Sequence, residues 1–140
     1  NVGNKPSSVS WHQSRMAAIL EDIFTVNFHH DKYHSFLENK LGKKYRIDGF
    51  VDAGDIKFAV EIDGLQHYEY VPRFHRQGEI GLELQQETDR IKDSLCESAG
   101  VPLARIDARY WDGEEGTFWD LMFHQLPEEL VKKIEEYLIL

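Results

Sequence analysis

The chain contains the stretch Phe58-Ala-Val-Glu-Ile-Asp-Gly-Leu-Gln-His67, in which an apolar run leads directly into side chains that bind metals or protons. Three of these side chains, Glu61, Asp63 and His67, fall within seven residues. A fourth, Asp48, lies upstream in the sequence Arg-Ile-Asp-Gly-Phe. Carboxylate oxygens are the ligands that hard divalent cations prefer, and a nearby histidine can accept a proton near neutral pH. The pattern therefore indicates a metal-dependent hydrolase.

The apolar run predicts a strand that pairs with its upstream neighbour. Residues 44–51 and 56–63 are the two expected strands, because residues 52–55, Asp-Ala-Gly-Asp, have the composition of a tight turn. A four-residue loop would place Asp48 opposite Ala59. Because side chains alternate along a strand, Asp48, Glu61 and Asp63 would share one face. The residues expected on the core face are Phe58, Val60 and Ile62.

The remaining elements follow from hydrophobic periodicity and turn residues. Helices are predicted at residues 12–27, 83–99, 118–126 and 127–138. Ser10 or Ser14 would cap the first helix. The second helix would have Leu84, Ile91 and Leu95 as its apolar stripe and would end at Gly100. A third strand is predicted at 101–106, and a short helical turn within 28–43. We expect an α/β (α+β) fold of order α-β-β-α-β-α, in which helices flank a small mixed sheet. A flexible lead-in at 1–10 would precede one domain at 11–140.

Composition limits the class of protein. A length of 140 residues suits one compact domain. The sequence contains no run of about 18 apolar residues, so no membrane span is predicted. The polar residues 1–10 lack the apolar core of a signal peptide. With Cys96 as the sole cysteine there is no internal disulfide framework, so we expect a cytoplasmic protein.

The net charge of −9 predicts weak affinity for nucleic acid, although the acidic residues are unevenly distributed. The segment from Asp112 onward holds eight acidic residues and two lysines. Candidate contacts to DNA are Lys43, Lys44, Arg73, Arg76 and Gln66. An ordinary solvated surface explains these residues equally well. Further domains or a partner protein would then supply part of the binding.

Taken in order, five motifs resemble the PD-(D/E)XK nuclease superfamily. More narrowly, they are similar to the branch that holds very-short-patch repair endonucleases and phage homing-type endonucleases with an E-D-x-H-D pattern. The motifs are Arg46-Ile-Asp-Gly-Phe50, Glu61-Ile-Asp-Gly-Leu-Gln-His-Tyr68, Phe74-His-Arg-Gln-Gly-Glu-Ile-Gly81, Asp89-Arg-Ile-Lys-Asp-Ser-Leu-Cys96 and Leu103-Ala-Arg-Ile106. Any one of these motifs is weak, whereas their joint order and spacing, over roughly residues 10–110, is fairly specific.

The resemblance implies a DNA endonuclease with Mg²⁺ or Mn²⁺ as cofactor. The carboxylates that would bind the cation are Asp48, Asp63 and Glu61. His67 would be the general base, and Asp89 would orient its ring. Lys92, one helical turn from Asp89, would contact phosphate or pair with Asp89.

The sequence departs from the family pattern at two positions. The first glutamate of the pattern falls at Gln13, which cannot ionise; Glu21 on the same helix is the alternative. Asp63 stands where the wider superfamily has lysine, so His67 would take over the activation of water. Gln13 and the negative charge favour a second hypothesis, a nuclease-fold module for DNA binding or protein interaction that has lost catalysis. A nuclease acting on RNA is a third.

Overall fold

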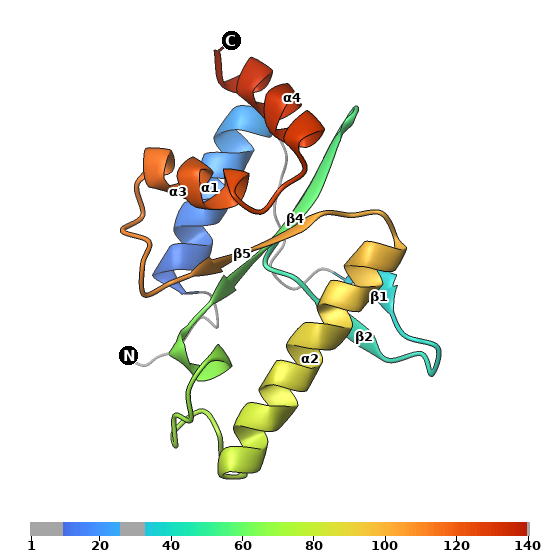
Figure 1. Ribbon diagram of the computed structural model, residues 1–140, viewed down its shortest axis with the longest axis vertical. Coiled ribbons are helices and arrows are strands. Elements are labelled where there is room, and N and C mark those ends of the chain that lie inside the picture. Colours follow the sequence, from blue (N-terminus) through green and yellow to red (C-terminus); the bar gives the residue numbers. More distant parts are fainter. Residues whose placement is uncertain (1–9, 26–32, 140) are drawn as a thin grey trace.

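The computed structural model describes residues 10–25 and 33–139. The helices are α1 (Trp11–Phe24), the short 3-10 helix η1 (Leu65–His67), α2 (Glu79–Ser98), α3 (Glu115–Phe123) and α4 (Glu128–Ile139). The strands are β1 (Tyr33–Glu38), β2 (Lys44–Arg46), β3 (Gly49–Ala53), β4 (Ile56–Asp63) and β5 (Leu103–Asp107). The fold is a mixed α+β fold in which helices flank small sheets, as expected (Figure 1).

The central sheet has the strand order β3-β4-β5. β3 and β4 form an antiparallel hairpin, whereas β4 and β5 are parallel and are joined through α2. Parallel neighbours need such a crossover, and it brings the ends of β4 and β5 to the same edge of the sheet. α1, α3 and α4 contribute to the hydrophobic cluster on one face of the sheet, and α2 and the β1–β2 pair contribute to the cluster on the other.

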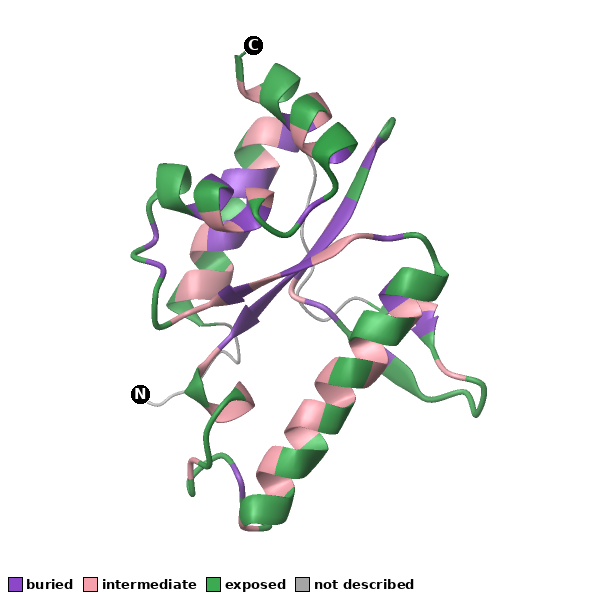
Figure 2. Cartoon of the chain, viewed as in Figure 1, coloured by how far each residue is buried: buried purple, intermediate pink, exposed green. Residues whose placement is uncertain are grey.

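β4 is buried along nearly its whole length, with only Lys57 exposed (Figure 2). As predicted, Phe58, Val60 and Ile62 enter the cluster built with α1, α3 and α4. Ala59 packs on the other face, with residues of α2 and the β1–β2 pair. Glu61 and Asp63 alternate onto that second face and are also buried. Two carboxylates therefore lie under α2, away from bulk water.

The hairpin differs from its predicted register. Ala53 pairs with Ile56, so the loop has two residues rather than four, and Phe50 instead of Asp48 lies opposite Ala59. Two-residue loops suit the twist of hairpins, and Gly54 at φ 67° supplies the left-handed conformation that they need. The shift moves Asp48, just before β3, to the level of Glu61.

Two stretches of the chain differ from the prediction, the first in continuity and the second in type. The expected strand 44–51 is divided into β2 and β3, which belong to different sheets. Instead of a helical turn within 28–43, β1 forms and pairs antiparallel with β2. The two strands are neighbours in the sequence, but each is short and their register is irregular, so the pattern within either segment does not reveal the pairing. Residues 28–32 lie outside the described residues, as does the lead-in 1–9.

The helices match their predictions apart from their ends. α1 begins after Ser10, whose hydroxyl accepts from the Gln13 amide in a capping box, and ends at Phe24. α2 begins four residues before its predicted start, and Gly100 follows it at φ 72°. Leu84 is exposed, contrary to prediction, because the apolar contacts of α2 with the sheet begin only at Ile91.

The C-terminal helices also start at slightly different residues. α3 starts at Glu115, before the predicted 118, and α4 covers Glu128–Ile139 directly after Pro127. Among the described residues, no helix is long and apolar enough to cross a membrane.

Candidate active site

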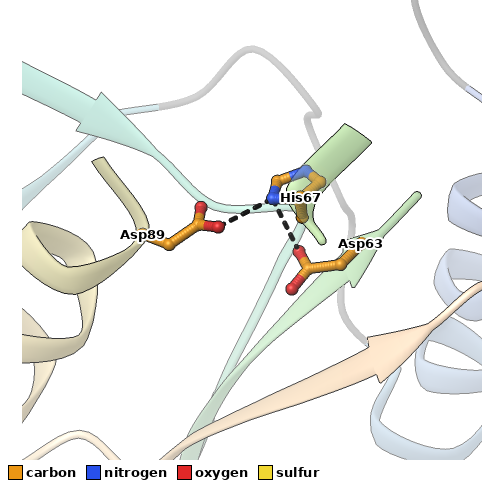
Figure 3. Close-up of side chains that lie close together, drawn as sticks. All are labelled: Asp63, His67 and Asp89. Atoms are coloured by element: carbon orange, nitrogen blue, oxygen red, sulfur yellow. Dashed lines mark hydrogen bonds and ion pairs between the residues drawn. The ribbon is translucent and has the colours of Figure 1, made fainter. Parts of the chain in front are cut away.

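The end of β4 leads into a histidine–carboxylate pair. After Asp63 the chain turns through Gly64 into η1, which ends at His67, while Asp89 comes from the middle of α2. His67 Nδ1 lies 2.9 Å from Asp89 Oδ2 and 3.6 Å from Asp63 Oδ1 (Figure 3). His67 Nε2 makes no hydrogen bond within residues 10–25 and 33–139. A ring that donates from Nδ1 to a carboxylate leaves Nε2 free to accept a proton.

The surroundings of His67 favour its charged form. Burial acts to lower the pKa of the ring, but the hydrogen bond that His67 donates to Asp89 and the negative charge of Asp63 outweigh it, so the pKa is raised above 6.5. Burial likewise opposes ionisation of Asp89, and the bond to His67 overcomes it and lowers the pKa of that carboxyl. Gln85 donates to the other Asp89 oxygen. The pair can therefore hold and release a proton at the histidine while Asp89 stays ionised.

A second group of carboxylates lies between β4, the start of β3 and α2. Glu61 Oε1 accepts from the Asp48 amide at 2.8 Å, and its Oε2 accepts from Lys92 Nζ at 3.0 Å. Asp48 Oδ2 accepts from the Ile62 amide at 2.7 Å. Of the two roles expected for Lys92, pairing with Asp89 is not what the structure shows, because Lys92 pairs with Glu61.

Burial disfavours the ionised form of both carboxylates in this second group. Burial raises the pKa of Asp48. Burial and the neighbouring Asp48 raise the pKa of Glu61 to about 7, even though Lys92 and Arg105 act to lower it. A proton or a cation can relieve this excess of charge.

Gln13 occupies the position beside Asp48 that the family pattern assigns to glutamate. Its Nε2 donates to Asp48 Oδ1 at 2.5 Å, while its Oε1 accepts from the Ser10 amide. Glu21 follows eight residues later on the same helix, which is about 12 Å further along the axis. Gln13, not Glu21, is therefore the residue of this helix that reaches the site.

Arg105 links the two groups, and the sequence analysis did not single it out. Its guanidinium donates to both oxygens of Asp63 at 3.1 and 3.2 Å and to the Asp89 carbonyl at 3.1 Å. Its backbone amide donates to Gln125 Oε1, and its backbone carbonyl accepts from Gln125 Nε2, both at 2.8 Å. The parallel register pairs Arg105 with Glu61. Because side chains alternate along a strand, this register would have placed the Arg105 side chain on the same face of the sheet as Glu61.

His75 fixes the loop that follows η1. The buried ring accepts from the Val71 amide at 2.8 Å through Nδ1 and donates to the Gln66 carbonyl at 2.9 Å through Nε2. A Cβ on Gly81 would lie 2.8 Å from the His75 Cβ, so this close approach requires glycine. Both ring nitrogens of His75 are therefore used in hydrogen bonds to the backbone around this loop.

The residues proposed to bind DNA are spread over two regions. Lys43 and Lys44 lie where β2 begins, and Arg73 and Arg76 lie between η1 and α2. All four side chains are exposed, whereas Gln66 is half-buried. Neither region contributes to the hydrogen bonds of the histidine–carboxylate pair that the described residues make.

The residues present fit a hard divalent cation. Oxygen or nitrogen atoms of Asp63, His67 and Asp89 lie within 4.8 Å of one another. Each carboxylate oxygen has two lone pairs, so Asp48 and Asp63 keep acceptor capacity beyond their present bonds. Burial is the main cause of the raised pKa values of Asp48 and Glu61, and a cation bound beside them would act to lower both.

The chain is similar to three uncharacterized viral proteins. It is 31% identical over 75 residues to Uncharacterized protein 094L of Frog virus 3 (isolate Goorha), a match that covers 54% of this chain and 47% of that protein. It is 35% identical to Uncharacterized protein 307L of Invertebrate iridescent virus 6, over 51% of this chain and 38% of that one. It is also 35% identical to Uncharacterized protein 033L of Invertebrate iridescent virus 3, over 62% and 43%.

These matches cover less than half the length of each relative. No protein-family model matches the chain, and no solved structure matches it.

Proposed function

We propose that this chain is the catalytic domain of a metal-dependent DNA endonuclease of the PD-(D/E)XK type, in the branch of very-short-patch repair and phage homing-type enzymes. The observation that carries the proposal is the His67–Asp89 bond at 2.9 Å, formed between two segments 22 residues apart, beside the buried carboxylate of Asp63. A surface histidine with an incidental neighbour would not explain the additional carboxylates, Asp48 and Glu61, on the same side of the sheet.

The arrangement of elements supports a restriction-endonuclease-like core. The hairpin β3–β4, the crossover helix α2 and the parallel strand β5 follow α1 in the order that the motif resemblance implies. Within this order Asp48 precedes the hairpin, Glu61 and Asp63 end its second strand, and Asp89 lies on the crossover helix.

The chemistry proposed for these side chains is hydrolysis of a phosphodiester. Asp89 holds His67 in the form with Nδ1 protonated, so Nε2 takes a proton from water. The oxygen of that water forms a bond to phosphorus as the bond from phosphorus to the leaving oxygen breaks, and the leaving oxygen takes up a proton from solvent. Lys92 and Arg105 limit repulsion among the carboxylates and keep Glu61 and Asp63 in place.

Asp48 and Asp63 would hold Mg²⁺ or Mn²⁺, with Glu61 beside them. When bound, such a cation neutralises phosphate charge and lowers the pKa of water. Burial of Asp48 and Glu61 supports this assignment, because buried carboxylates need a compensating charge in order to ionise.

Nicking of supercoiled plasmid DNA tests the proposal. Cleavage is expected with Mg²⁺ or Mn²⁺, is lost in EDTA, and falls by about 10²–10⁴ in His67→Ala. His124→Ala is the matched control, because His124 caps α3 away from the site. Cleavage that persists at the parent rate in His67→Ala would refute the proposal.

The second candidate function is a nuclease-fold module for DNA binding or protein interaction without catalysis. The observation that favours it is the Gln13 amide, which satisfies Asp48 without a metal. Thermal unfolding separates the two candidates, because a cation that binds the folded state raises the melting temperature. An unchanged melting temperature in Mg²⁺ and Mn²⁺, together with intact plasmid, would favour the non-catalytic module.

A further inference from the structure

Two exposed tyrosines contact the same arginine at the edge of the candidate active site. The Arg109 guanidinium carbon is 4.8 Å from the ring centre of Tyr68 and 5.1 Å from that of Tyr110. Tyr68 is 41% exposed and Tyr110 is 72% exposed. We call Tyr68, Arg109 and Tyr110 the stacking cluster. Isolated exposed aromatic side chains are common, but three planar groups held in contact form a continuous π-surface.

Hydrogen bonds position two members of the cluster, Arg109 and Tyr68, before any ligand binds. Asp107 ends β5 and accepts from Arg109 Nε at 3.0 Å and from Nη2 at 2.6 Å. This two-point bond fixes the plane of the guanidinium. Tyr68 is held by a separate bond, since its hydroxyl donates to Asp63 Oδ2 at 3.3 Å. A preformed surface loses little conformational entropy on binding, which favours affinity.

The charge of the cluster does not suit phosphate. Arg109 is already paired with Asp107, and Glu69 lies 3.9 Å from its Nη1. The whole chain carries a net charge of −9, which opposes binding of either single-stranded or duplex DNA through its phosphates, so affinity has to come from the bases. What the cluster offers a ligand is ring faces, and base faces become available when nucleotides are unpaired and unstacked.

The cluster lies beside the reacting groups. The ring centres of His67 and Tyr68 are 6.5 Å apart, and Asp63 pairs in register with Asp107. The ends of β4 and β5 therefore carry both the candidate catalytic residues and the stacking cluster. Figure 1 shows these two strand ends on the same side of the molecule as η1.

We infer that the stacking cluster binds unpaired bases of single-stranded DNA next to the candidate active site, so that the substrate is DNA with an unpaired segment at the cleaved bond. The placement beside His67 rests on the proposed function, whereas binding to single strands does not require cleavage. The outer face of Tyr110 stacks on a base, and Arg109 and Tyr68 support it from behind.

The test is a fluorescence-anisotropy titration of the His67→Ala chain with a labelled oligothymidylate, the matching duplex and an oligouridylate. Tyr110→Ala should weaken binding of oligothymidylate by about 5- to 150-fold, the range expected for one base stacked on an aromatic ring. Tyr110→Trp should preserve binding because it keeps a flat ring. Tyr137→Ala is the matched control, because Tyr137 is 41% exposed but packs against Phe24 near the end of α1.

Each outcome bears on the inference. Tighter binding of the single strand than of the duplex, lost in Tyr110→Ala and kept in Tyr137→Ala, supports it. Equal binding by Tyr110→Ala, a preference for duplex, or no binding to any probe overturns it, and tighter binding of oligouridylate overturns the assignment to DNA. If the parent chain nicks plasmid DNA but Tyr110→Ala does not weaken binding of oligothymidylate, this inference alone is refuted. If Tyr110→Ala weakens binding but the parent chain does not nick plasmid DNA, the proposed catalysis alone is refuted.

Discussion

Replacing Lys92 with methionine should destabilise the chain in a way that depends strongly on pH. Lys92 is the cation bonded to Glu61 at 3.0 Å, and both side chains are largely buried, with 14% and 5% exposed. The pKa of Glu61 is about 7 in the folded chain against an ordinary value of 4.5. Between these values the folded state binds more protons than the unfolded state, so the contribution of Glu61 to stability falls as pH rises.

The size of the effect differs between acid and alkaline conditions. At about pH 9 Glu61 is ionised in the parent, and loss of its partner leaves a buried carboxylate that must stay unpaired or take up a proton, at a cost of about 3–5 kcal/mol. At about pH 5 Glu61 is already protonated when folded, so Lys92→Met costs about 1 kcal/mol for a lost hydrogen bond. Methionine retains most of the length of the lysine chain, so little packing is lost.

Urea unfolding at the two pH values measures this difference. Lys92→Met/Glu61→Gln should lose most of the pH dependence, because no ionisable group remains in the pair. The control is Lys132→Met, whose partner Glu128 is exposed and whose free energy of unfolding should change by at most about 0.5 kcal/mol. An equal loss of stability in Lys92→Met at both pH values would show that the charge of Glu61 is not what Lys92 offsets.

Three other predictions follow from the same contacts. Asp89→Asn removes the charge bonded to His67, so the pKa of His67 in an NMR titration should fall and cleavage should drop about 10²-fold or more; an unchanged pKa would contradict the pairing. Affinity for Mg²⁺, measured by calorimetry, should rise as pH increases through about 7, because Glu61 must lose its proton as the cation binds; a flat profile would exclude Glu61 as a ligand. Gln13→Glu replaces an amide donor beside Asp48 with a carboxylate, so the melting temperature should fall without metal and rise more steeply with Mg²⁺ than in the parent, whereas the exposed Gln77→Glu should change neither.

Sequence reasoning was most successful where one segment determines its own structure. The apolar run that becomes β4 alternates between two faces, which placed Phe58 in the core and Glu61 with Asp63 on the opposite face. Turn and capping residues such as Ser10 and Gly100 set the ends of helices through local hydrogen bonds and backbone conformation. The convergence of His67 and Asp89 followed from motif order, and the structure brings them into contact.

The missed features depend on how one segment pairs with another, which the pattern within a single segment does not specify. β1 exists because β2 supplies its hydrogen bonds, and the hairpin register depends on a loop two residues shorter than expected. The role of Arg105 can be recognised only when β5 is placed parallel to β4, since Arg105 then lies beside Glu61 and bonds to Asp63. The direction of the Lys92 side chain likewise depends on how α2 lies across the sheet, which its own periodicity does not specify.

Chemical rescue of His67 provides the most direct measurement of catalysis by the histidine–carboxylate pair. In His67→Gly the missing ring leaves space beside Asp89, and added imidazole can supply the lost base. We predict that His67→Gly fails to nick plasmid DNA in Mg²⁺, that imidazole restores nicking, and that imidazole restores nothing in Asp48→Asn. Nicking by His67→Gly at the parent rate without imidazole would contradict the assignment of His67 as the general base.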